Sequence, residues 1–292
     1  MALDPQALEE KAKKTLQSAS GGFSFFSNKE DKLQSAADLY VQAANAYRLQ
    51  QMNKEAGAAF EAAAKIHEEK LNEPDDAANI MVDAFKVYRK DHPSDAVRCL
   101  NKAIARYTTK GNFRRAASHK ENAAELIEVE MGDRKTAMEY YADAARWYED
   151  DGAKALANKL WLKVADISAL EGQYFPAIAN YEKVADSSLQ NHLMKYSVKD
   201  YYMKAGICAL ASKDLVTARR NLERYKESDP SFASQRECQL LADLIEAIEA
   251  GNQEMFTEKL YLYDQMSQLD KWKTEILVRV KNQIEEADNE FS

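Results

Sequence analysis

The sequence has few of the residues that end helices and shape tight turns. Its 292 residues include only 9 Gly and 5 Pro, although 46% of them are hydrophobic. So few turn formers in a chain of this length indicate an all-helical protein. No apolar run approaches the 18 or so residues that a membrane span needs. The N-terminal stretch MALDPQALEEKAKK is amphipathic rather than basic and then apolar, so we expect no secretory signal.

Cysteine is also scarce. Cys99, Cys208 and Cys238 lie far apart and are odd in number. This usage is typical of reduced, buried thiols in a cytosolic protein. We therefore expect a cytoplasmic protein, either soluble or attached peripherally to a membrane.

The motifs of common enzymes are missing. The sequence has no P-loop, no dinucleotide fingerprint, no H-E-x-x-H and no paired C-x-x-C. The four histidines, His67, His92, His119 and His192, show no metal-ligand spacing. We therefore expect a binding protein with no catalytic residues, no metal and no cofactor.

Charge is distributed unevenly along the chain. Residues 227–292 carry 15 Asp or Glu and 6 Lys or Arg, whereas residues 1–226 carry 33 acidic and 34 basic residues. An acidic end on a balanced body suggests two electrostatically distinct contacts. Nucleic-acid binding, which needs a basic domain, is disfavoured.

A three-point pattern recurs about every 20 residues. It consists of a small residue, a large apolar residue four positions later and a small or medium apolar residue three after that, which places all three on one helical face. Lys120 is the exception, because it takes the large slot in its repeat. The pattern runs through Ala36–Tyr40–Ala43, Ala56–Phe60–Ala63, Ala77–Met81–Ala84, Ala96–Leu100–Ala103, Ala116–Lys120–Ala123, Ala137–Tyr141–Ala144, Ala157–Trp161–Val164, Ala177–Tyr181–Val184, Val198–Tyr202–Ala205 and Ala218–Leu222–Tyr225.

Helices with such faces must stack to bury them. Turn signals such as DHPSD, TKGNF and EMGDR separate the repeats. We predict a right-handed α-solenoid of antiparallel helix pairs over residues 1–226, similar to tetratricopeptide repeats (TPR). The alternative is a compact bundle with accidental periodicity. Pro230 marks a break, and residues 227–292 are predicted to form a C-terminal helical bundle with an acidic tail.

Basic residues and aromatic residues supply the candidate contacts. In a solenoid, equivalent positions line one surface, so clustered cations predict a basic stripe, although solubilising charge is the alternative. Three phenylalanines lie in a Gly/Ser-rich loop at about residues 18–31, where they either fold back on their own domain or contact something outside it. The candidates are Arg114, Arg115, Lys120, Lys159, Lys163, Lys195, Lys199 and Lys204 for the stripe, and Phe23, Phe25 and Phe26 for the loop.

Several stretches, in order along nearly the whole chain, resemble the alpha-SNAP family of soluble NSF attachment proteins, in its fungal form. They are FSFFS, AADLYVQAANAYR, GNFRRAA, ANKLWLKVAD, YSVKDYYMKAG, FASQREC and LDKWKTEIL. The resemblance implies an adaptor in membrane fusion that is monomeric when free. Several copies would wrap the SNARE four-helix complex, recruit and stimulate the hexameric AAA ATPase NSF, and touch the membrane surface through the N-terminal loop.

The resemblance also implies roles for residues. Arg114, Arg115, Lys159 and Lys163 would face acidic patches of the SNARE bundle, with Lys199 and Lys204 as weaker candidates. The candidates for contact with the ATPase are Asp214, Glu246, Glu249, Glu285, Glu286, Asp288, Glu290 and Phe291. Phe291 stands where the family commonly has leucine, and Asn112 stands where some members have a basic residue. A TPR-type peptide-binding scaffold or cochaperone unrelated to SNAREs is the alternative function.

Overall fold

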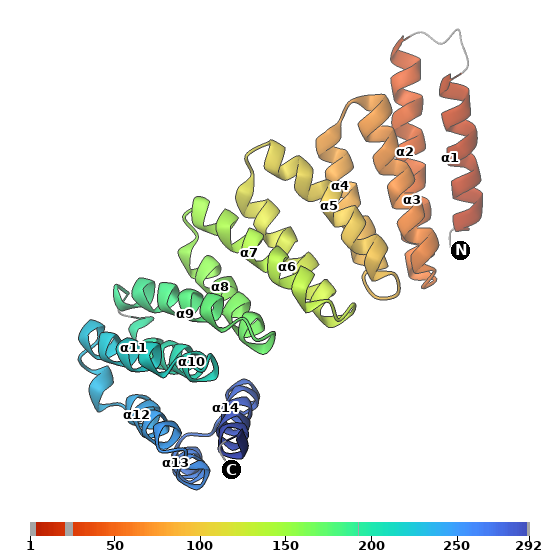
Figure 1. Ribbon diagram of the computed structural model, residues 1–292. Coiled ribbons are helices and arrows are strands. Elements are labelled where there is room, and N and C mark those ends of the chain that lie inside the picture. Colours follow the sequence, from red (N-terminus) through yellow and green to blue (C-terminus); the bar gives the residue numbers. More distant parts are fainter. Residues whose placement is uncertain (1–3, 21–25, 192, 291–292) are drawn as a thin grey trace. The chain divides into compact units, whose positions relative to one another are not determined.

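The computed structural model describes the backbone of residues 4–20, 26–191 and 193–290, with side chains for 4–19, 29–191 and 193–285. These residues form α-helices joined by short turns, and no strand occurs among them (Figure 1). The prediction of an all-α fold is confirmed. The α-helices are α1 Pro5–Ser20, α2 Phe26–Leu49, α3 Asn53–Ile66, α4 Pro74–Tyr88, α5 Pro93–Thr109, α6 Phe113–Val129, α7 Arg134–Asp150, α8 Lys154–Leu170, α9 Tyr174–Leu189, α10 Val198–Ala211, α11 Leu215–Ser228, α12 Arg236–Glu249, α13 Gln253–Met266 and α14 Lys271–Glu290.

Three short helical segments complete the order. They are a π-helical turn, η1 His67–Leu71, and two 3₁₀ turns, η2 Lys195–Ser197 and η3 Phe232–Ser234.

The first helices reach further into the predicted N-terminal loop than expected, because α1 runs to Ser20 and α2 begins at Phe26. The predicted loop over residues 18–31 was therefore too long. Ala19 is buried in the core that α1 forms with α2, and this packing extends the helix past Ser18.

The chain divides into two compact units, Met1–Ala157 and Asn158–Ser292. In the first, each helix from α1 to α7 packs on the next, as stacked helical repeats do. In the second, α9 packs on α10, and α10 also contacts α11, α12 and α14. Phe232, Phe256 and Ile276 share one core with Tyr181 and Tyr202 there. A boundary at residue 226 between repeats and cap stays a prediction.

The repeat pattern identifies the core. Every residue that the three-point pattern selects is buried, apart from Lys120. The small residues let neighbouring helices approach closely while the large residues fill the space between them. The solenoid architecture inferred from the period is therefore confirmed in its helix order and in its buried face.

The predicted turns end one helix and cap the next. Gly111 and Gly132 adopt left-handed backbone conformations, with φ of 73° and 68°. The residue after each is an N-cap: the Asn112 side chain accepts a hydrogen bond from the Arg115 amide, and that of Asp133 from the Thr136 amide. Asn112 thus has a structural role at the start of α6.

The three cysteines are free and buried, as expected. Burial raises the pKa of the Cys99 thiol to about 12 and also raises that of Cys208 and Cys238. Thiols that stay protonated at neutral pH are poor nucleophiles. Among the described residues, no helix combines the length and the apolar character needed to cross a membrane.

Gly57 is a close-packing position in α3. A Cβ atom there would overlap the ring of Tyr88, which is buried and donates a hydrogen bond from its hydroxyl to Glu61 at 3.0 Å. Gly57→Ala should gain about 1 kcal/mol in helix propensity but lose about 1–3 kcal/mol through overpacking. We expect a lower unfolding temperature. The loss should be smaller when Gly57→Ala is made in a Tyr88→Leu background, and stabilisation by Gly57→Ala alone would contradict the packing.

Candidate partner-binding surfaces

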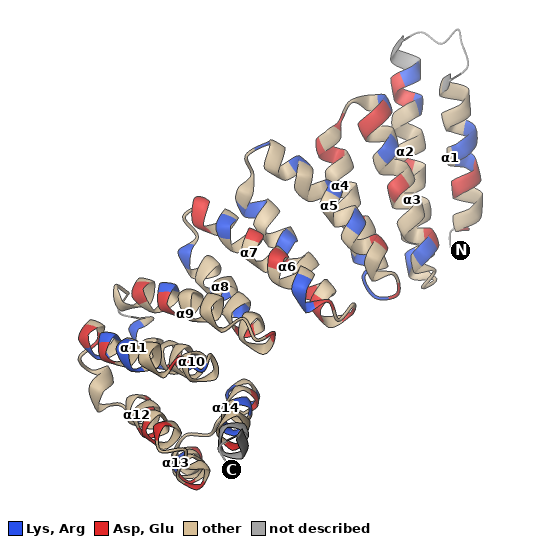
Figure 2. Cartoon of the chain, in the orientation of Figure 1, with Lys and Arg blue, Asp and Glu red and all other residues tan. Residues whose placement is uncertain are grey.

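Basic residues (Lys and Arg) and acidic residues (Asp and Glu) both occur on the helices of each unit (Figure 2). Arg114 and Arg115 lie in the first turn of α6, which holds no acidic residue. Positive charge at a helix N-terminus opposes the helix dipole and is normally unfavourable. Arg114 is 66% exposed, with Asp151 3.6 Å away. Arg115 donates to Asn79 at 2.8 Å and lies over the Tyr107 ring at 4.3 Å. The contacts with Asp151, Asn79 and Tyr107 offset the unfavourable interaction with the helix dipole. Arg114 stays open to solvent.

Lys120 is largely buried, with 13% of its side chain exposed. Its ammonium lies 3.6 Å from the centroid of the Tyr140 ring and 3.4 Å from a carboxylate oxygen of Asp143. The cation–π contact with Tyr140 and the ion pair with Asp143 together explain how a lysine can occupy an apolar slot of the repeat. Contact between Lys120 and a partner stays a prediction.

His119 lies beside this group, stacked on Tyr107 with the ring centroids 5.4 Å apart. Burial, aided by the positive charges of Arg115 and Lys86, lowers its pKa from 6.5 to about 4. The imidazole of His119 therefore binds a proton more readily in the unfolded chain than in the folded protein. As a result, the folded protein loses stability as the pH falls from about 6.5 towards 4.

We expect the change His119→Phe to weaken this pH dependence. Phenylalanine keeps the stacking and cannot be protonated. Wild type should lose about 2 kcal/mol more than the variant in free energy of unfolding between pH 7 and pH 5. Urea unfolding of both proteins at the two pH values measures the difference. Equal losses would show that His119 does not control this transition.

Lys159 and Lys163 lie on α8 in the second unit. They are four residues apart and therefore share one face of the helix. Lys159 is exposed and Lys163 is partly buried. Because Arg114 and Arg115 belong to the other unit, a stripe that joins all four cations stays a prediction.

Lys204 lies on α10 with 15% of its side chain exposed. Its ammonium is 2.8 Å from the Asp166 carboxylate and 4.9 Å from the centroid of the Trp272 ring. These contacts are internal to the second unit. Sequence reasoning missed them because Asp166 and Trp272 are far from Lys204 along the chain.

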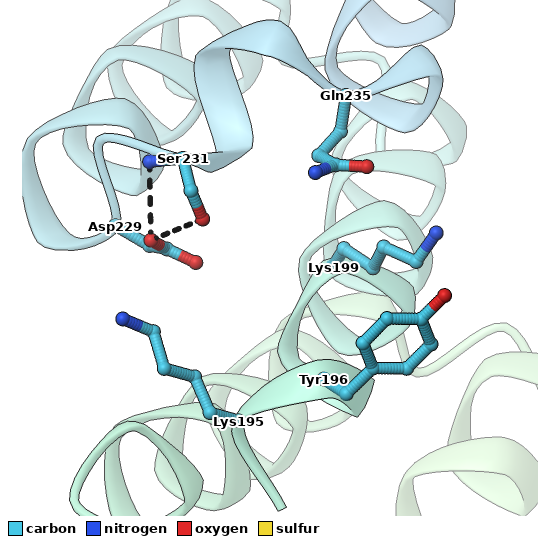
Figure 3. A pocket seen from close by; sticks show the side chains of 6 residues that line it. All are labelled: Lys195, Tyr196, Lys199, Asp229, Ser231 and Gln235. Carbon is cyan, nitrogen blue, oxygen red and sulfur yellow. Dashed lines mark hydrogen bonds between the residues drawn. The ribbon is translucent and has the colours of Figure 1, made fainter. Parts of the chain in front are cut away.

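Lys199 lines a cavity of about 280 Å³ between η2 and the segment that leads into α12 (Figure 3). Its ammonium lies 3.0 Å from Glu237. Asp229, on the opposite wall, accepts hydrogen bonds from the Ser231 amide at 3.2 Å and from the Ser231 hydroxyl at 2.7 Å. The other lining residues are Lys195, Tyr196 and Gln235. The opposite wall belongs to the break around Pro230, which sequence analysis marked but did not place beside the lysines.

The acidic candidates differ in their surroundings. Asp214 caps α11 and accepts hydrogen bonds from the Thr217 amide and hydroxyl, which lower its pKa. Glu249 pairs with Arg219, and Glu246 is exposed. Glu285 accepts a hydrogen bond from Gln253 at 3.3 Å.

Several predicted contacts fall where side chains are not described. Phe23, Phe25 and Phe291 lie outside the described residues, and Phe26 is placed only by its backbone, at the start of α2. Glu286, Asp288 and Glu290 continue α14, again by backbone alone. The membrane-binding and tail assignments therefore stay predictions.

Comparison with known proteins identifies the family. The family model "Soluble NSF attachment protein, SNAP" matches residues 3–285. A "Probable vesicular-fusion protein sec17 homolog" of Neurospora crassa is 63% identical over all of both chains, and one of Schizosaccharomyces pombe is 48% identical over all of both. The human "Alpha-soluble NSF attachment protein" is 36% identical over 97% of this chain and 95% of its own. The chain therefore belongs to the soluble NSF attachment protein family.

Proposed function

We propose that this protein is an adaptor in vesicle-mediated transport and membrane fusion, including traffic between the endoplasmic reticulum and the Golgi. It binds assembled SNARE complexes and brings the ATPase NSF to them for disassembly. The observation that carries the proposal is the family match over residues 3–285, together with relatives described as vesicular-fusion proteins. An adaptor of this kind does its work by binding and needs no catalytic residues of its own.

Binding to the SNARE bundle is electrostatic in this proposal. Arg114 and Lys159 are exposed cations, and Lys163 shares the face of Lys159 on α8. A basic surface against an acidic helical bundle sets association rate and register more than raw affinity. Charge matching also tolerates many SNARE combinations better than shaped pockets do.

Contact with NSF is assigned to the acidic end of the chain. Residues 227–292 carry a net charge of −9, with 15 acidic and 6 basic residues. Glu246 and Glu249 are exposed on α12, and the terminal acidic residues follow the core of α14. Opposite charges on the ATPase would steer its approach. We assign stimulation of the ATPase to the same contact.

The membrane contact is assigned to Phe23, Phe25 and Phe26. The protein is then a cytoplasmic, peripheral membrane protein, monomeric when free and present in several copies on a SNARE complex. A weak aromatic anchor raises the effective concentration of the adaptor at membrane-borne complexes and still allows it to leave after each cycle.

A pull-down on purified soluble SNARE complex tests the function. The protein should bind the complex alone and, with NSF and ATP, release the individual SNARE chains. A peptide-binding scaffold or cochaperone would capture peptides ending in a free carboxylate and leave the complex intact. Failure to bind the complex at low salt would refute the proposal.

A further inference from the structure

Asp166 joins four helices of the second unit. It lies on α8, and its carboxylate accepts hydrogen bonds from the Lys204 ammonium of α10 at 2.8 Å and from the Tyr181 hydroxyl of α9 at 2.5 Å. Its backbone carbonyl accepts a hydrogen bond from the indole Nε1 of Trp272, on α14, at 3.0 Å. One residue of α8 therefore contacts the C-terminal helix directly and also orders the two helices beside it.

The rings around Asp166 enclose the ion pair. Trp272 meets Tyr181 edge to face, with centroids 5.9 Å apart, and the Lys204 ammonium lies within 6 Å of both ring centroids. The pair is mostly shielded, with 15% of the Lys204 side chain and 31% of the Asp166 side chain exposed. A charged pair in such surroundings is stronger than one at an open surface, and its geometry is more closely fixed.

Further along α14, two polar side chains reach the ends of repeat helices. Arg279 donates to the carbonyls of Leu170 at 2.9 Å and Ala169 at 3.4 Å, at the C-terminus of α8. Gln283 donates to the carbonyl of Ala211 at 3.1 Å, the last residue of α10. The last carbonyls of a helix lack partners within it, and a cation there also complements the helix dipole. In this way α14 caps two repeat helices.

The buried face of α14 adds an apolar seam. Ile276, Leu277, Val280 and Ile284 are buried in the core of the second unit. Directional bonds add to this seam: those of Trp272 and Arg279 to α8, and that of the Lys273 ammonium to Asp200 of α10 at 2.6 Å.

The same helix α8 carries the lysine pair. Lys159, Lys163 and Asp166 follow each other at spacings of four and three residues, so they lie along one face. At 1.5 Å of rise per residue, Lys159 and Asp166 are separated by roughly 10 Å along the axis. One rigid element therefore carries both the proposed SNARE contact and the attachment of α14.

We propose that Asp166, Trp272 and Arg279 are positioning residues that fix α14, and with it the acidic C-terminus, relative to the lysine face of α8. This inference rests on the proposed function, because it assigns SNARE contact to α8 and ATPase contact to the end of α14. Lys204 then acts from inside the unit, by holding Asp166 in place. Loosening the attachment should leave SNARE binding intact and impair disassembly.

Trp272→Phe and Arg279→Met test this inference. Each removes a bond to α8 and leaves the buried residues Ile276, Leu277, Val280 and Ile284 in place. We expect affinity for soluble SNARE complex to change by less than twofold, while the rate of disassembly by NSF and ATP falls at least fivefold. Hydrogen exchange of backbone amides in residues 271–285 should speed up at least tenfold. Arg279→Lys, which keeps the charge and one donor, should recover part of the rate.

Matched controls in the first unit are Arg98→Met, which removes a guanidinium bound to Glu61, and Tyr148→Phe, which removes a hydroxyl that donates a hydrogen bond to Glu121. Both should disassemble SNARE complexes at the wild-type rate. The inference is overturned if Trp272→Phe and Arg279→Met match the controls, or if they lose SNARE binding and disassembly in equal measure. If Arg279→Met does not fold, the milder Trp272→Phe decides. If wild type itself releases no SNARE chains, the proposed function fails, and hydrogen exchange still reports whether these residues fix α14.

Discussion

Reversing two charges on α8, Lys159→Glu with Lys163→Glu, should abolish co-precipitation with the SNARE complex. The two side chains share one helical face, and Lys159 is exposed on it. Each reversal replaces an attraction to an acidic bundle with a repulsion. At about 1 kcal/mol or more per site, the pair should cost at least about 2 kcal/mol, a weakening of roughly thirtyfold.

The wild-type interaction should itself weaken as salt rises, because exposed charges are screened beyond about 8 Å at physiological ionic strength. The measurement is a binding isotherm on soluble SNARE complex at two salt concentrations, with circular dichroism to confirm that helicity is retained. Arg220→Glu with Lys226→Glu on α11 is the matched control, since it makes the same change of net charge in the same unit. Retained binding in the α8 variant, or equal loss in the control, would refute a specific contact at α8.

The repeat architecture could be predicted from the sequence because its signal is local and periodic. Residues three and four apart must share a helical face, so Ala177, Tyr181 and Val184 could be assigned to the core without knowing what they touch. The turns were equally predictable from local residues. In the three-residue turn between α5 and α6, Gly111 ends the first helix and Asn112 caps the second.

The roles of individual cations could not be predicted in the same way. Lys199 and Lys204 look alike in the sequence, yet each has a different set of partners from other helices. Lys120 stands out in the repeat pattern, but its contacts with Tyr140 and Asp143 could not be predicted from that pattern. Those partners come together only through the stacking of helices that are distant in sequence. Charge counts identify where cations are abundant, and tertiary contacts decide which of them face outward.

The attachment of α14 illustrates the same limit. Trp272, Ile276, Val280 and Ile284 recur every four residues and therefore share one helical face, and the last three of them are buried. The bonds that Trp272 and Arg279 make to backbone carbonyls of α8 had no sequence signal, because any residue supplies a carbonyl. Which carbonyls these side chains reach depends on how α8 packs against α14 in the folded protein.

Replacing two aromatic residues of the N-terminal segment, Phe25→Ser with Phe26→Ser, should strongly reduce binding to liposomes. Burying a phenylalanine is worth roughly 1.5–3 kcal/mol, so the two changes remove at most about 3–6 kcal/mol of membrane attachment. After the ordering cost is subtracted, we expect a fall in membrane partitioning of at least about tenfold. Co-flotation with liposomes of neutral and anionic lipid measures this directly.

The consequence for activity depends on where the SNARE complex is. Disassembly of membrane-anchored complexes should slow in the Phe25→Ser/Phe26→Ser variant, because the aromatic anchor no longer adds to the SNARE contact. Disassembly of soluble complexes should stay near the wild-type rate. The control is Phe25→Leu with Phe26→Leu, which keeps apolar area and should retain most of the attachment. If soluble and anchored complexes lose activity equally, these phenylalanines act inside the fold and the membrane contact must be sought elsewhere on the protein.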